Sequence, residues 1–200
     1  MGYAKGRSQL KGLFFGSLLI VVACGSRVLL NRLHLAINVE LVTLSTLLAA
    51  VYLGKAWGVL VPLTSMMLSD RIIGNSNIYL FTWSAYAIIG LLSLTHKELT
   101  RYISQFSNIP ALVNKLLAII SLGVFSSLFF YIWTNFGVWY QGWYEPTFKG
   151  LIKCYLMGLP FLKYNLIGNL VLVTFVFGLA ELVFSGLPRL SGSRKVFSYE

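Results

Sequence analysis

The chain has 200 residues, of which 57% are hydrophobic and only 11% are charged, and its mean hydropathy is +0.76. Soluble domains carry about 25% charged residues, so this composition excludes an ordinary soluble domain, a disordered chain and a disulfide scaffold. The net charge is +10. Because the Lys and Arg residues lie between long apolar runs, we attribute it to membrane topology and expect no nucleic-acid partner. The two cysteines predict no metal cluster.

Long apolar runs predict how the chain crosses the bilayer. A spanning helix needs ~20 largely apolar residues to cross ~30 Å of hydrocarbon. The sequence therefore predicts an all-α integral membrane bundle over residues 12–185, after a basic N-terminus (1–11) and before a basic tail (186–200). About six spans are expected, at residues 12–28, 38–54, 56–70, 77–95, 114–135 and 165–185.

A further apolar stretch, residues 147–161, comes before the last span and is interrupted by Lys149, Lys153 and Pro160. Its length predicts an interfacial or re-entrant segment rather than a seventh span.

The first apolar run has a second interpretation. Basic residues precede it, and Val21-Val22-Ala23-Cys24 resembles a bacterial lipoprotein cleavage box. A lipoprotein signal normally delivers a soluble domain, which this composition does not provide. We therefore favour a first transmembrane helix.

The distribution of basic residues predicts the orientation, since Lys and Arg are retained in the cytoplasm. Six spans place both termini on one side, and that side carries ten of the 16 Lys and Arg residues. The opposite side carries the other six: Arg27, Arg32, Arg71, Lys149, Lys153 and Lys163. The sequence thus predicts a multi-pass protein of the inner (plasma) membrane with both termini in the cytoplasm.

Neutral polar and aromatic residues gather on the predicted outer side. Seven of the nine asparagines fall there, and Tyr79, Trp83 and Tyr86 share one helix face. A second stripe comprises Gly123, Ser127, Tyr131 and Asn135. Because an unpaired amide is costly in hydrocarbon, these groups are expected to line a small-molecule pocket. The predicted substrate-binding residues are Asp70, Arg71, Trp83, Tyr86, Asn135, Trp139, Asn165 and Asn169.

Each of these residues also has a structural interpretation. The outer aromatic residues are typical of an interfacial belt, and the asparagines are typical of helix–helix hydrogen bonds. Asp70 and Arg71 are equally compatible with a local ion pair, and Arg27 with a contact to lipid headgroups or to an anionic substrate. Glu181, near the inner end of the last span, is interpreted as a packing residue.

Catalytic patterns are absent from the sequence. It contains no H-E-x-x-H, G-x-S-x-G or P-loop motif, and the acidic residues are scattered. We therefore predict neither an enzyme nor a bound cofactor or metal. Gly12 and Gly16 are four residues apart, a spacing that favours either docking to another membrane subunit or packing within the bundle.

The pattern resembles the substrate-binding S-components of energy-coupling factor (ECF) transporters. The likeness rests on six short spans, an outer pocket and the run from Ile37-Asn38-Val39-Glu40 through Trp57-Gly58 to Leu68-Ser69-Asp70. Closer still is an uncharacterised bacterial membrane family that is itself similar to S-components. Its signatures resemble residues 68–74 (LSDRIIG), 134–139 (TNFGVW) and 150–155 (GLIKCY). Members often have Asn-Phe-x-Pro after the first outer loop, where this chain has Asn38-Val39-Glu40-Leu41.

The resemblance implies a function and partners. The protein would capture a small nutrient such as a vitamin at the outer face and dock onto a transmembrane coupling subunit. Two cytoplasmic ATPases would then drive its release. A membrane structural or assembly protein and a membrane-embedded enzyme are the alternative functions.

Overall fold

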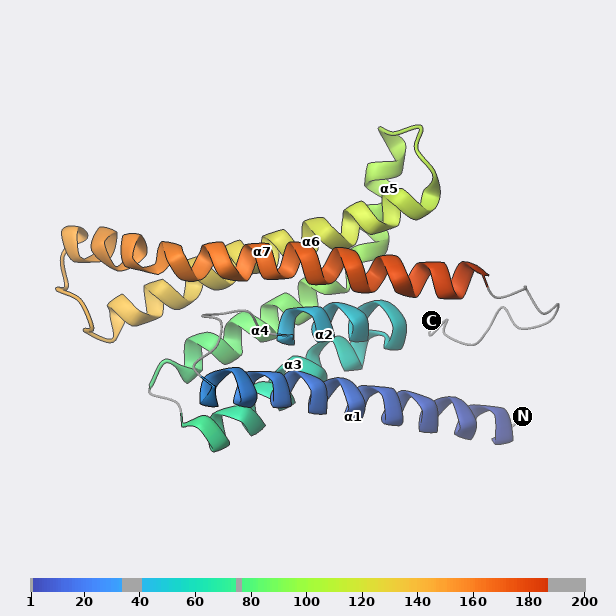
Figure 1. Ribbon diagram of the computed structural model, residues 1–200, viewed down its shortest axis with the longest axis horizontal. Helices are drawn as coiled ribbons and strands as arrows, with labels where there is room; N and C mark the ends of the chain where they lie inside the picture. The colour runs from blue at the N-terminus through green and yellow to red at the C-terminus, as the bar shows by residue number, and fades with distance from the viewer. Residues whose placement is uncertain (1, 34–40, 75–76, 187–200) are drawn as a thin grey trace.

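The computed structural model describes residues 2–33, 41–74 and 77–186, and within these ranges the chain is helical without any strand (Figure 1). The prediction of an all-α protein is therefore confirmed. The elements are α1 (Gly2–Arg32), α2 (Val42–Leu48), the π-helical turn η1 (Ala49–Leu53), α3 (Lys55–Ile73), α4 (Tyr79–Ser93), α5 (His96–Gln105), α6 (Ala111–Tyr140) and α7 (Phe148–Gly186). The predicted loop motif at residues 37–40 and the tail 187–200 lie outside the described residues.

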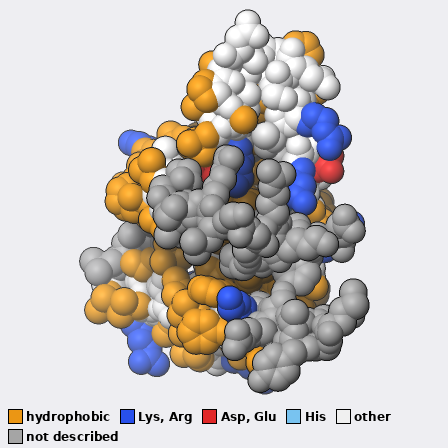
Figure 2. Space-filling view, turned by 90° about the vertical axis from the view of Figure 1, so that its right-hand side faces the viewer, with side chains coloured by type: hydrophobic (Ala, Val, Ile, Leu, Met, Phe, Trp, Pro, Cys, Tyr) orange, Lys and Arg blue, Asp and Glu red, His pale blue; other side chains and the backbone are white. Residues whose placement is uncertain are grey.

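The long helices run side by side between two ends of the bundle. α6 and α7 form an antiparallel pair whose connection, residues 141–147, projects furthest at one end (Figure 1). We call this the hairpin end; the α3–α4 connection lies there too. The start of α1, the end of α7 and α5 mark the opposite end, which we call the terminal end. Lys and Arg side chains are scattered over the visible surface of the terminal end, with few acidic groups among them (Figure 2).

Within the described ranges, three helical stretches are long and apolar enough to cross a membrane: Gln9–Arg32, Ala111–Tyr140 and Phe148–Val183. Two shorter apolar stretches, Val42–Leu53 and Tyr79–Ser93, accompany them. The apolar helices indicate a bilayer environment, whereas the count of six spans and the orientation stay predictions. Residues 42–53 rise only about 18 Å, which is less than the hydrocarbon thickness, so this stretch does not cross alone.

The short α2 is the centre of the fold. Val42 to Leu47 are all buried. Val42 joins one apolar cluster with residues of α1, α3 and α4, whereas Leu44 and Leu47 join a second with α6 and α7. Burial on every side fits the composition of α2, which consists of Val, Leu, Thr and Ser residues and carries no charge. The outer helices instead expose large apolar side chains, as membrane-facing helices do.

The prediction of a separate interfacial or re-entrant segment at residues 147–161 is wrong. Residues 148–161 form the first part of α7, which continues without interruption to Gly186. A proline removes only one N–H from the helix, and membrane helices tolerate it where neighbouring groups compensate. α6 also packs along this part of α7 and holds it in place, since Tyr155 Oη donates to the carbonyl of Ile132 across the interface at 2.9 Å.

Candidate functional site

A buried ion pair joins three helices near the hairpin end. Arg27 of α1 forms a salt bridge with Asp70 Oδ1 of α3 and donates to Ser69 Oγ at 2.7 Å. Trp83 of α4 donates its indole N–H to Asp70 Oδ2 at 2.7 Å. Asp70 is only 7% exposed. The carboxylate is thus held by a cation and a neutral donor from two other helices, which is what a buried charge requires.

The ion pair borders an apolar cluster, against which its partner Trp83 packs. Tyr86 is 1% exposed and packs against Phe130 of α6, with ring centroids 5.1 Å apart. It belongs to the cluster that includes Met66 and Ile89, against which Trp83 also packs. The predicted aromatic stripe on α4 is therefore a real face, with Tyr79 and Trp83 rings 5.2 Å apart. The apolar surroundings strengthen the electrostatic interactions of Asp70.

Asp70 does not pair with its neighbour in the sequence, contrary to one of the interpretations above. Consecutive helical residues point about 100° apart, and Arg71 is exposed while Asp70 faces the bundle. Arg27 fills the place expected for Arg71. It is 43 residues from Asp70 in the sequence, so no local pattern could have indicated this partnership.

The predicted asparagines lie elsewhere, in the interface between α6 and α7. Asn169 Nδ2 donates to Ser127 Oγ at 2.9 Å and to Asn165 Oδ1 at 3.1 Å, and Asn169 is 3% exposed. Asn135 Nδ2 donates to the carbonyl of Tyr131 at 2.8 Å. The bond between Asn169 and Ser127 joins α7 to α6 and is of the helix–helix kind that the sequence allowed, whereas the other two bonds lie within one helix. The structure thus brings Asp70 and Trp83 into contact with each other, whereas the side chains of Asn135, Asn165 and Asn169 lie elsewhere.

Two other predicted sites are occupied by contacts within the chain. Trp139 Nε1 donates to the carbonyl of Glu145 at 3.0 Å, which closes the α6–α7 hairpin. A Cβ at Gly16 would collide with the ring of Trp57, and Gly12 is also buried. Gly16 therefore serves the packing of α1 on α3, and docking through Gly12 and Gly16 stays a prediction.

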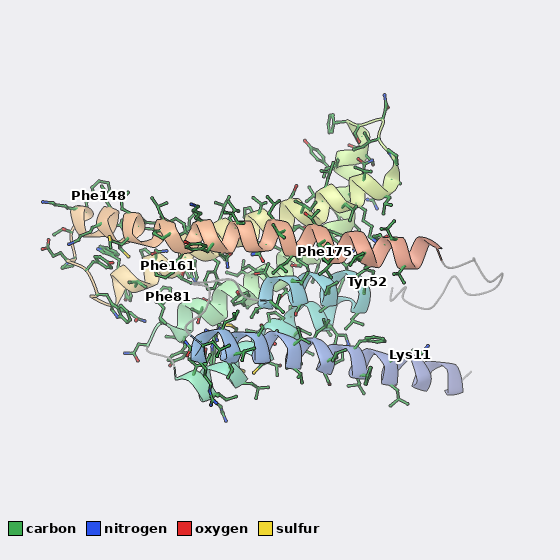
Figure 3. The ribbon with its side chains drawn as sticks, viewed as in Figure 1. Lys11, Tyr52, Phe81, Phe148, Phe161 and Phe175 are labelled. Carbon is green, nitrogen blue, oxygen red and sulfur yellow. The ribbon has the colours of Figure 1, made fainter. Side chains whose placement is uncertain are left out.

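A second ion pair joins three elements towards the terminal end. Glu181 of α7 pairs with Lys115 of α6, and its Oε1 accepts a hydrogen bond from Tyr52 Oη at 2.8 Å. Lys115 Nζ also lies 5.4 Å from the centre of the Tyr52 ring. Figure 3 shows Tyr52 on the side of the bundle next to α7. The packing role expected for Glu181 agrees with these contacts, but its partners are 66 and 129 residues away, beyond any local signal.

His96, at the start of α5, is buried beside this second ion pair. Its Nδ1 lies 3.0 Å from the carbonyl of Ser93. Burial lowers the pKa of the imidazole below its ordinary value of 6.5, and the nearby Lys97 and Lys115 lower it further. The neutral form is therefore favoured in the folded protein.

Cavities on the described surface include three that bear on function. One of about 410 Å³ lies in the α6–α7 hairpin between Tyr144, Lys149 and Lys153. A cavity of about 280 Å³ is lined by His96, Thr100 and Lys115 among others, and an apolar groove of about 210 Å³ lies between α1, η1 and α7. Among the described residues, no group of three or more His, Cys, Asp or Glu side chains could hold a metal ion.

The helices and these polar contacts define the class: an all-helical protein with apolar, membrane-type helices joined by buried polar links. Residues 8–190 match the model of a family of unknown function, DUF6580, and the chain belongs to that family. This confirms the predicted membership of an uncharacterised family. Neither the curated proteins nor the solved structures include a significant match.

Proposed function

We propose that the protein is a substrate-binding membrane subunit, similar to an ECF S-component, that takes up a small nutrient such as a vitamin. The observation that carries this proposal is the cluster of Arg27, Asp70 and Trp83 near the hairpin end. Ionisable groups inside a membrane bundle are costly, and they commonly mark substrate pathways. A pairing that served packing alone is achieved at lower cost by apolar side chains.

The same cluster suggests how a ligand is held. A polar group of the substrate would exchange with one partner of the Asp70 carboxylate, while its ring would stack on Trp83 and Tyr79. Tyr79 is 37% exposed and lies against Trp83, so this aromatic pair is reachable from the hairpin end. The apolar layer around Tyr86 would form the floor of the site. These features favour a small molecule with a ring and a charged or strongly polar group.

The chain carries no P-loop, so energised uptake requires partners. By resemblance these are a transmembrane coupling subunit and two cytoplasmic ATPases. α1 is a suitable docking helix because it exposes large apolar side chains such as Phe14 and Val21, each 66% exposed.

A structural or assembly role is the second candidate, and one observation favours it. Asn165, Asn169 and Ser127 satisfy one another inside the α6–α7 interface. Such links stabilise a membrane bundle without any ligand. The two functions differ in what Asp70 does, since an assembly protein needs its ion pair only for packing.

Mass spectrometry of small molecules that co-purify with the protein tests the proposal. The wild type is compared with Asp70→Asn and with Glu181→Gln, a matched control in which the same change is made to the other ion pair. We expect one compound to be enriched with the wild type and with Glu181→Gln, and to fall about ten-fold or more with Asp70→Asn.

Equal enrichment with all three proteins would show that Asp70 does not bind the compound. Enrichment of no compound in any of them would favour the assembly role. Trp83→Phe, which keeps an aromatic ring, provides a second variant if Asp70→Asn does not fold. Affinity purification in mild detergent tests the partners separately, and repeated recovery of the protein alone would contradict the ECF assembly.

A further inference from the structure

We propose that the cavity in the α6–α7 hairpin binds a phosphate ester. Its lining includes Trp143, Tyr144, Glu145, Lys149 and Lys153. Of the three cavities described above, it alone falls within the ~300–1,000 Å³ that is usual for small-molecule sites. It lies at the beginning of α7, which the label Phe148 marks in Figure 3, where the hairpin projects beyond the other helices.

The walls of this cavity are held by specific contacts. The carbonyl of Glu145 accepts hydrogen bonds from Trp139 Nε1 at 3.0 Å and from the backbone N–H of Thr147 at 2.7 Å. Gly150 is needed for this close approach, since a Cβ there would collide with the same carbonyl oxygen. Thr147 Oγ1 in turn accepts from the N–H of Gly150 at 3.1 Å. The loop is therefore fixed against the start of α7, and the cavity is preformed.

The charges in the cavity favour an anion. Lys149 and Lys153 are four residues apart on α7 and so lie on one face. Within the described residues neither ammonium group forms a salt bridge. Glu145 is the one carboxylate in the lining, which leaves the lining with an excess of one positive charge. The first turn of α7 adds the positive end of the helix dipole.

Membrane topology does not account for these two lysines. In the predicted orientation the hairpin faces outward, where Lys and Arg are disfavoured. Arg27, also on that side, is explained by its salt bridge with Asp70. Lys149 and Lys153 form no such salt bridge within the described residues. They differ from Arg71 and Lys163, which are predicted on the same side, because they line one cavity together, and a bound anion would account for that pairing.

The shape of the site indicates which anion. Two lysines on adjacent turns can contact different oxygens of one phosphate group, for which lysine is a common ligand. Trp143, which is 61% exposed, and Tyr144 offer aromatic surface to the organic part of the ligand. Because the cavity lies at one end of a bundle of apolar helices, the phosphate belongs either to a lipid headgroup or to a soluble ester. This site shares no residue with the Asp70 cluster and does not depend on the proposed function.

Native mass spectrometry of the full-length, delipidated protein tests the proposal with two probes, dioleoyl phosphatidylglycerol and glycerol 3-phosphate. The wild type is compared with a Lys149→Ala/Lys153→Ala variant and with Lys163→Ala. Lys163 is an exposed lysine of the same helix that is not part of the cavity lining. We expect the double variant to weaken binding of the preferred probe about ten-fold or more, and Lys163→Ala to change it less than about two-fold.

The two probes distinguish the sources of the phosphate. Binding of phosphatidylglycerol that glycerol 3-phosphate does not compete identifies a lipid headgroup, whereas competition identifies a site for soluble esters; either result supports the site. Equal binding by the wild type and the double variant would overturn it, and so would an equal loss with Lys163→Ala. A Lys149→Arg/Lys153→Arg variant, which keeps both charges, should retain binding and shows that a loss is not due to misfolding.

Discussion

The two ion pairs of the bundle are built from similar parts but differ in burial. At the hairpin end, the side chains of Arg27 and Asp70 are 18% and 6% exposed; towards the terminal end, those of Lys115 and Glu181 are 32% and 14% exposed. In each, a carboxylate accepts from a cation and from an aromatic side chain. One joins α1, α3 and α4, whereas the other joins η1, α6 and α7.

This difference teaches that the same chemical link can be essential in one place and replaceable in another. Water cannot solvate a buried charge whose partner has been removed, so breaking a buried ion pair strongly destabilises the protein. Lys115 has a flexible side chain in the first turns of α6 and can extend to water when Glu181 is removed. We therefore expect the hairpin-end pair to be the more sensitive one in every comparison below.

Removing the carboxylates should give the largest effect. Asp70→Ala removes the buried carboxylate that pairs with the Arg27 guanidinium, and we expect a loss of about 3–5 kcal/mol in the free energy of unfolding. Glu181→Ala should cost only about 1 kcal/mol, because Lys115 is partly exposed. Unfolding titrations in detergent micelles measure both. Equal losses would show that burial does not separate the two pairs.

Removing the aromatic hydrogen-bond donors should also destabilise the hairpin-end pair more than the terminal-end pair, but by a smaller margin. Trp83→Phe removes an N–H that donates to a buried carboxylate, with an expected loss of about 2 kcal/mol. Tyr52→Phe removes the corresponding O–H, with an expected loss of about 1 kcal/mol. The same titrations test the order, and a larger loss with Tyr52→Phe would reverse the comparison.

Exchanging the cations should affect only the hairpin end. Arg27 Nη1 donates to both Ser69 Oγ and Asp70 Oδ1. An ammonium group is more strongly hydrated than a guanidinium and is therefore costlier to bury at this position. Arg27→Lys should therefore cost about 1 kcal/mol, while Lys115→Arg should change stability by less than about 0.5 kcal/mol. Thermal unfolding of the two variants beside the wild type is sufficient. A destabilised Lys115→Arg variant would indicate that the terminal-end pair is as geometrically demanding.

Much of the fold is predictable from the sequence because the length and hydropathy of an apolar run indicate a membrane helix. The apolar runs led directly to α1, α4 and α6. The break predicted before the last span was wrong, since Lys149, Lys153 and Pro160 sit within one continuous helix. Local composition marks these residues as unfavourable in a span, but the packing of α6 along α7 decides that the helix continues.

The candidate site was only half predictable, for a physical reason. Helical spacing correctly indicated the face of Trp83 and Tyr86, because residues three or four apart share a face. It did not indicate that Asp70 pairs with Arg27 of another helix, or that Asn169 bonds Ser127 across an interface. Contacts between helices depend on their rotation and depth in the bundle, and neither has a local signature.

Lowering the pH should give the smallest effect and act on the terminal end alone. The pKa of His96 is lowered by burial and by Lys97 and Lys115, against the opposing influence of the Ser93 carbonyl and Glu98. The unfolded chain therefore binds a proton more readily than the folded protein does. The resulting stability is complete above the ordinary pKa of 6.5 and is lost as the pH falls from there through the lowered pKa.

Hydrogen exchange at about pH 7.5 and about pH 5.5, corrected for intrinsic rates, should show weaker protection of the α5 amides at the lower pH. The turns around Asp70 should be unaffected. A His96→Gln variant should lose this pH dependence, and an unchanged dependence would show that another group near Lys115 titrates instead.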